Sequence, residues 1–195
     1  DFSEVKEFFD NLRSSGVKDF RAYFENHPEA VAKCANIVKV VDVNKATLEL
    51  YKARSKEELR CGGLSLVLSP ESYEKFREEL ISIAKGKTRF GCEAINKTLN
   101  GEKKHIALTW SVAPGYEKTL SKVLVSKIDI TEQKRTEEAL RDGEEKFCAI
   151  TASAKDAIIL IDNEGKIFYW NPAAERIFGY SCLLYTSPSP RDRTR

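Results

Sequence analysis

The residue types that most often carry out catalysis are sparse in this sequence and stand apart from one another. Its two histidines, His27 and His105, lie near no serine or cysteine in a nucleophile motif such as G-x-S-x-G. No H-E-x-x-H, P-loop or G-x-G-x-x-G pattern occurs, so neither zinc hydrolysis nor phosphate binding by a glycine-rich loop is indicated. We therefore expect no catalytic residue and no metal site, and a self-contained enzyme is the least favoured class.

The cysteines could serve redox chemistry, but their spacing argues against it. No C-x-x-C pair or nearby histidine cluster occurs, which favours unpaired thiols in a reducing compartment. Cys92 could sense oxidants only if it were exposed and its pKa were depressed, and no neighbour in the sequence supplies the necessary charge. The five cysteines are Cys34, Cys61, Cys92, Cys148 and Cys182.

Composition and charge narrow the class of partners. The 195 residues are 42% hydrophobic and 32% charged, which suits one full globular domain and part of another. The net charge of +2 arises entirely in residues 182–195, so the rest is neutral and nucleic-acid binding is not expected. No apolar run approaches the roughly 18 residues of a spanning helix. We expect no membrane contact and a cytoplasmic location, although the parent protein could be membrane-anchored.

The two ends of the chain indicate a fragment. The sequence contains no methionine, so we expect it to be a piece of a longer protein. Residues 182–195 are rich in Ser, Pro and Arg and also resemble translated adapter sequence. We expect this tail to be non-native or disordered, and we assign it no function.

Hydrophobic periodicity predicts the elements of the main domain. Residues 1–35 predict short helices, and the β-branched stretch 38–44 predicts a strand. Asn44 is placed to cap the helix that follows, because its side-chain oxygen can accept an N–H of the first turn. After a longer helix over 71–87 come three runs with alternating polarity, two of them joined by the turn Asn100-Gly101. Helices followed by antiparallel strands predict an α+β domain.

The same pattern starts again near the C-terminus. Residues 157–162 and 166–171 predict a hairpin, and Asn171 then precedes a proline at the first position of a helix. Both copies have an Asn cap, an Ala two residues later and an aromatic residue seven residues later. The matching positions are Asn44, Ala46 and Tyr51 in the first copy and Asn171, Ala173 and Phe178 in the second.

The second copy, DAIILIDNEGKIFYWNPAAERIFGYS, resembles the opening of a PAS domain, and GEKKHIALTWSVAPGYEKTLSKVLVSKIDITEQKR resembles the end of another. The resemblance implies a PAS-like antiparallel sheet flanked by helices, followed by a linker helix and a truncated second PAS-like unit. The expected divisions are N-terminal helices (1–35), a PAS-like domain (36–130), a linker helix (131–150), the start of a second PAS-like domain (151–181) and the tail (182–195).

Asp129-Ile130-Thr131 resembles the motif that ends PAS domains, where the last strand leads into a signalling helix. Asp129 or Thr131 could accept from the first turn of the helix, and Glu132 adds a negative charge at its positive end. Leu140 and Phe147 lie seven residues apart on an otherwise charged helix. We expect two copies of this helix to pair through Leu140 and Phe147, which form a narrow apolar seam, and so to make a homodimer. The alternative is that the helix is a solvated connector.

The resemblance also implies a role in signal transduction. It suggests the sensory region of a sensor histidine kinase in a two-component phosphorelay, with a downstream output domain in the parent protein. The alternative is a ligand-free interaction or dimerisation module, for example ahead of a cyclic-dinucleotide enzyme.

A ligand of a PAS-like domain would lie between the helices and the inner face of the sheet. No axial histidine for haem and no flavin-adduct cysteine motif is found there, so neither haem nor a photoadduct-forming flavin is expected, and the ligand is left unidentified. The residues expected on the inner face, which an ordinary core also needs, are Phe90, Cys92, Ile106, Leu108 and Trp110.

Overall fold

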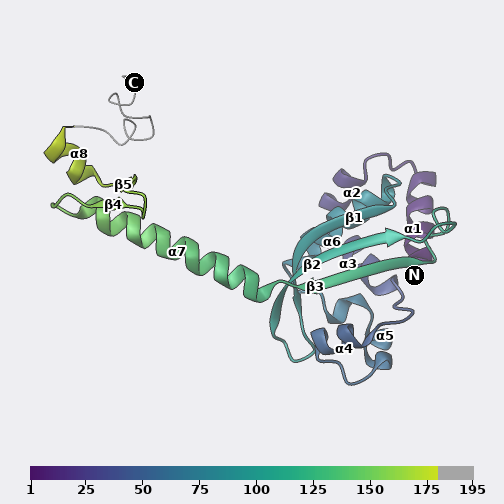
Figure 1. Ribbon diagram of the computed structural model, residues 1–195. Helices are drawn as coiled ribbons and strands as arrows, with labels where there is room; N and C mark the ends of the chain where they lie inside the picture. The colour runs from purple at the N-terminus through teal and green to yellow at the C-terminus, as the bar shows by residue number, and fades with distance from the viewer. Residues whose placement is uncertain (180–195) are drawn as a thin grey trace, which may run out of the picture. The chain divides into compact units, whose positions relative to one another are not determined.

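The computed structural model describes residues 1–179, which form two compact units that divide between Lys134 and Arg135 (Figure 1). The predicted tail, 182–195, and the end of the predicted second domain lie outside the described residues. The first unit is α+β, as predicted, with helices packed against an antiparallel sheet. No helix in the described part of the chain is long and apolar enough to cross a membrane.

The sheet of the first unit has the order β1-β2-β3. Strands β1 (Arg89–Lys97) and β2 (Lys103–Val112) pair around a turn in which Gly101 takes a positive φ of 84°. Strand β3 (Val123–Asp129) pairs with the other edge of β2, with Leu108 opposite Lys127 and Ile106 opposite Asp129. Side chains alternate between the faces of a strand, so the predicted residues on β1 and β2 share the inner face with Lys127 and Asp129.

Helices cover this inner face. The long helix α6 (Ser72–Ala84) packs on β1, and α3 (Pro28–Ile37) packs on α6. The helices α1 (Ser3–Ser14) and α2 (Phe20–Asn26) contribute Phe9 and Phe24 to the same hydrophobic core. The N-terminal helices and the sheet therefore share one core. The domain limits given in the sequence analysis stay predictions.

A smaller group of helices lies beside this core. It consists of α4 (Lys45–Tyr51), α5 (Lys56–Gly62) and the 3₁₀ turn η1 (Leu64–Leu66). Tyr51 and Leu59 are buried in its centre. Asn44 caps α4, and its side-chain oxygen accepts from the Thr47 N–H at 2.9 Å.

The predicted strand over residues 38–44 is wrong. This stretch belongs to neither sheet and makes no ladder with β3. Lys39 pairs with the first residue instead: its N–H donates to the Asp1 carbonyl at 3.0 Å, and its carbonyl accepts from the Asp1 amino group at 2.7 Å. A strand needs a neighbour to take its hydrogen bonds, and the residues before 38 form α3 instead.

The second unit contains most of α7 (Thr131–Ser153), a hairpin and a short helix. Strands β4 (Ile159–Ile161) and β5 (Ile167–Trp170) pair as the sequence predicts, with Gly165 at a φ of 81° in their turn. Asn171 then caps α8 (Pro172–Phe178).

Candidate functional site

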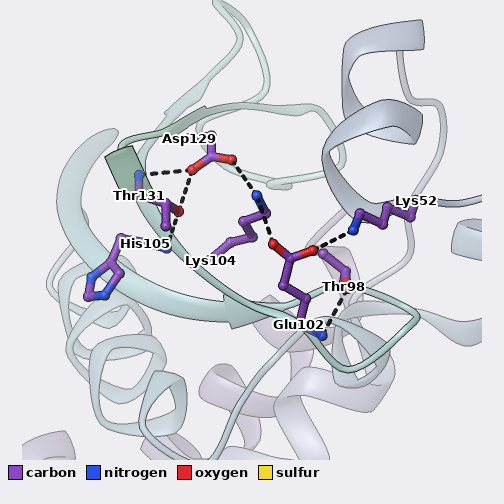
Figure 2. Close-up of polar contacts among 7 residues, drawn as sticks. All are labelled: Lys52, Thr98, Glu102, Lys104, His105, Asp129 and Thr131. Carbon is purple, nitrogen blue, oxygen red and sulfur yellow. Dashed lines mark hydrogen bonds and ion pairs between the residues drawn. The ribbon is translucent and has the colours of Figure 1, made fainter. Parts of the chain in front are cut away.

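The junction between β3 and α7 is held by hydrogen bonds that continue the sheet around a corner. The Ile130 N–H donates to the His105 carbonyl at 2.9 Å, and the His105 N–H donates to Thr131 Oγ1 at 3.0 Å. The Thr131 N–H in turn donates to Asp129 Oδ1 at 2.9 Å, so Asp129 satisfies the first amide of the helix (Figure 2). Thr131 is 4% exposed. The first turn of α7 is therefore tied to the sheet by backbone and side-chain bonds together.

A chain of charges extends from this junction to α4, as Figure 2 shows. Lys104 Nζ lies 3.3 Å from Asp129 Oδ2 and 3.2 Å from Glu102 Oε1, and Lys52 pairs with the other oxygen of Glu102. Burial raises the pKa of Asp129, but the bonds from Thr131 and Lys104 outweigh it, and the net pKa is lowered. Asp129 is thus an ionised partner shared by the sheet and the helix.

Lys52 is positioned by a strained backbone. It ends α4 with a φ of 55°, in the left-handed region that non-glycine residues seldom occupy. The preceding residue is tied to the β1–β2 turn, because the Leu99 N–H donates to the Tyr51 carbonyl at 3.0 Å. This geometry brings the Lys52 side chain to Glu102.

A surface hollow of about 310 Å³ lies beside this chain of charges. Lys127, which lines the hollow, donates from Nζ to the Tyr51 hydroxyl at 2.9 Å and lies 5.0 Å from the centre of the Tyr51 ring. Tyr51 also accepts from Asn96 Nδ2 at 2.7 Å. The residues that line the hollow are Ala46, Glu49, Leu50, Lys52, Lys104, Lys127 and Asp129.

The residues predicted to contact a ligand lie on the inner face of the sheet, where Ile106 and Trp110 are buried and the other three are half-buried. Ile106 and Trp110 are 0% and 1% exposed, and Phe90 stacks on Trp110 with 6.2 Å between ring centres. Leu108 packs against the main core. The Trp110 indole N–H is buried without a hydrogen-bond partner in the described part of the chain. These five positions thus share one face, while their role in ligand contact stays a prediction.

Cys92 lacks the features that oxidant sensing requires. It is half-buried, and burial, followed by the nearby carboxyl of Glu79, raises the pKa of its thiol. A raised pKa leaves little thiolate at neutral pH, and the thiolate is the reactive form.

Glu79 on α6 is a polar group that sequence reasoning missed. It is 6% exposed, and its side chain makes no hydrogen bond to any described residue. Desolvation raises its pKa to about 7 in spite of the charge on Lys127. Helical periodicity could have found it, because Glu79 shares the apolar stripe of Phe76 and Ile83. Lys52, Glu102 and Lys104 carried no comparable signal, because their positions depend on contacts between elements.

The predicted seam of α7 is only partly free. Leu140 is 64% exposed, but Phe147 packs edge-on against Tyr169 of β5, with 4.8 Å between ring centres. Near the start of the helix, Glu132 is exposed in the first turn, and Lys134 pairs with Glu93 of β1 at 2.9 Å.

A second anchor holds the far end of α7. Asn171 is fully buried, and its Nδ2 donates to the carbonyls of Thr151 and Asp156 at 2.9 and 3.0 Å. Its Oδ1 accepts from the N–H groups of Ile158 and Ala174, each at 2.9 Å. One amide side chain therefore joins the end of α7, the start of the hairpin and the first turn of α8.

Comparison with known proteins agrees with this architecture. The PAS domain family matches residues 28–132, and a second PAS domain match covers residues 145–193. Similar curated proteins include the sensor protein FixL of Bradyrhizobium diazoefficiens, 45% identical over 56 residues, which are 29% of this chain and 11% of that protein. Sporulation kinase A of Bacillus subtilis is 25% identical over 161 residues, or 82% of this chain and 26% of that protein.

These alignments cover about a quarter or less of the length of either relative. The first family match alone covers more than half of the present sequence, and it ends at the junction between β3 and α7. The chain therefore belongs to the PAS domain family.

Proposed function

We propose that this chain is the sensory and relay region of a sensor histidine kinase in a two-component phosphorelay. The observation that carries the proposal is the β3–α7 junction, where Asp129 and Thr131 join the last strand of the sheet to a long polar helix. A displacement of β3 would move the first turn of α7, because the two elements share these bonds. Output by a kinase domain elsewhere in the parent protein is supported by the similarity to sporulation kinase A.

The input to this relay is proposed to be a small ligand bound by the first unit, in the cytoplasmic part of the parent protein. The hollow beside the junction supports this proposal, because Lys104 and Asp129 belong to both. The packing of Ile106 and Trp110 favours the second candidate, a ligand-free module that only relays a conformational signal.

Dimerisation through α7 is part of the proposal. Leu140 and Ile150 are 64% and 68% exposed, and their separation of ten residues matches the a and d positions of successive heptads. A second copy of the helix could cover them in a coiled coil, and such a pair would carry the relayed movement to the next domain.

Native mass spectrometry of the chain, followed by denaturation, tests input and dimerisation together. We expect a dimer that carries extra mass and releases it on denaturation. A dimer without extra mass would favour the ligand-free candidate.

Leu140→Glu tests the proposed interface. We expect this variant to be monomeric, whereas the matched control Ala139→Glu, which adds the same charge one residue earlier, should stay dimeric. Equal behaviour of the two variants would contradict dimerisation through the Leu140 face of α7.

A further inference from the structure

The hollow between α4 and the ends of β2 and β3 combines charged and apolar walls. Ala46 and Leu50 contribute apolar surface from α4. Lys104 and Asp129, which are drawn in Figure 2, contribute charged groups from the sheet. Lys127, two residues before Asp129 on β3, also lines the hollow.

The charges around the hollow do not cancel. Glu49 pairs with Lys45 at 3.6 Å, Asp129 pairs with Lys104, and Lys52 pairs with Glu102. Lys127 is different, because no carboxylate among the described residues lies within ion-pair distance of its ammonium group. In the described part of the chain its ammonium group donates to the Tyr51 hydroxyl, which does not offset its positive charge.

The acidic group that faces Lys127 from the helical layer is Glu79 on α6. It does not cancel the charge of Lys127 fully, because burial raises the pKa of Glu79 to about 7 and favours its neutral form below that pH. Tyr51 faces Lys127 from α4 and is neutral, and Leu108 lies opposite it on β2. A partly buried ammonium in these surroundings gains from an anionic partner.

We infer that the hollow binds a small anion, with Lys127 holding its carboxylate or phosphate group and with Ala46 and Leu50 contacting its apolar part. This inference rests on the proposed sensory function and names the ligand class and the site. The ligand would then lie in the hollow between α4 and the ends of β2 and β3, and not against Phe90, Cys92 or Trp110.

The site has a direct route to the signalling helix. An anion bound by Lys127 would lie close to Lys104, because both lysines line the hollow. It would compete with Glu102 and Asp129 for the ammonium group of Lys104. Withdrawing Lys104 removes an ion pair from the Asp129 carboxylate, whose other oxygen accepts from the Thr131 N–H in the first turn of α7. Occupancy of the hollow and the position of α7 are therefore coupled through one lysine.

The test is a titration of the isotopically labelled chain with acetate and, separately, with inorganic phosphate, with chloride added to keep the ionic strength constant. We expect saturable shifts of the backbone amide signals at Lys127 and at Thr131 with at least one probe. Saturation with acetate alone would identify a carboxylate ligand, and saturation with phosphate alone a phosphorylated one. The absence of a saturable shift with either probe would overturn the inference.

Three variants locate the site. Lys127→Met should weaken binding by roughly tenfold, the factor expected for one charge-assisted hydrogen bond. The control Lys118→Met, which removes an exposed lysine from the β2–β3 loop, should leave binding unchanged. Glu79→Gln should bind equally well or more tightly, because it removes the competing acid.

Unchanged binding in Lys127→Met, or weaker binding in Glu79→Gln, would overturn the assignment to Lys127. That outcome is distinguishable from failure of the proposed function. If native mass spectrometry still detects a bound ligand, the sensory proposal survives, and only the site and the ligand class are wrong.

Discussion

The two ends of α7 are held by different chemistry. At its start, the helix is tied to the sheet by an ionised carboxylate, Asp129, which is partnered by Thr131 and Lys104. At its end, it is tied to the hairpin by the neutral and fully buried amide of Asn171, which makes four hydrogen bonds. Charged and partly exposed groups respond to protons, salt and competing ions, whereas a buried amide does not. The first end is suited to regulation and the second to permanent attachment.

The largest expected effect is at the buried amide. Asn171→Ala leaves two N–H groups and two carbonyls without partners, and we expect a loss of about 3 kcal/mol in the stability of the second unit. Hydrogen exchange of the Ile158 and Ala174 amides measures this loss. The matched control is Asn44→Ala, which removes only an exposed cap and should cost about 1 kcal/mol in the first unit.

Asn171→Asp separates the two functions of this side chain. It keeps the oxygen that accepts from Ile158 and Ala174 but removes the donor to Thr151 and Asp156. We expect faster exchange at the end of α7 together with a preserved cap on α8. Equal effects of the Asp and Ala variants would contradict the idea that the donor side attaches α7 to the hairpin.

A smaller effect is expected at the charged end. Asp129→Ala removes the acceptor for the first amide of α7 and a partner of Lys104, and should cost about 1 to 2 kcal/mol. Urea unfolding of the first unit and hydrogen exchange of residues 131–134 measure it. Asp142→Ala, on the exposed middle of α7, is the control and should change stability by less than about 0.5 kcal/mol. A loss as large as that of Asn171→Ala would remove the distinction between the ends.

Acid should weaken the charged end of α7, where Asp129 must stay ionised. The folded-state pKa of Asp129 is lowered, so its contribution is fully present above the ordinary value of 3.8 and is lost as the pH falls through the folded pKa. Carbon-detected titration should place the Asp129 midpoint below 3.8, and Thr131→Val should raise it because the hydroxyl bond is lost. A midpoint that Thr131→Val leaves unchanged would show that Thr131 does not stabilise the carboxylate.

Salt should produce the smallest effect. Raising the ionic strength from about 0.1 to 1 M shortens the screening length from about 10 to 3 Å, so the Lys104–Asp129 pair should weaken by a few tenths of a kcal/mol. Exchange of the Thr131 amide should quicken slightly, and that of Ala174 should not. A comparable response at Ala174 would indicate a general salt effect in place of screening at the charged end.

Local patterns predicted most of the elements. The alternation in β1, β2 and β3, the turns at Gly101 and Gly165, and both Asn caps all follow from interactions between residues close in the sequence. The candidate site was predictable only in part. Asp129 and Thr131 stood out because strand and helix meet there. Their partners on β2, which are Lys104 and His105, come from a segment more than twenty residues away.

The internal repeat shows where local information ends. Residues 38–44 and 166–171 both precede an Asn-capped helix, but only the second stretch forms a strand. The reason lies outside each stretch, because β5 has the neighbouring β4 as a hydrogen-bond partner, whereas α3 precedes residues 38–44.

The sequence by itself thus determined the helices, the hairpins, the caps and the strand that runs into a helix, because turn chemistry and periodicity act over a few residues. Only the tertiary structure decided which polar groups are buried and which charges meet. Glu79 acquired its raised pKa, and Lys127 its hydrogen bond to the Tyr51 hydroxyl, when α6 and α4 packed on the sheet. Desolvation and ion pairing depend on distances between elements, and local sequence does not specify those distances.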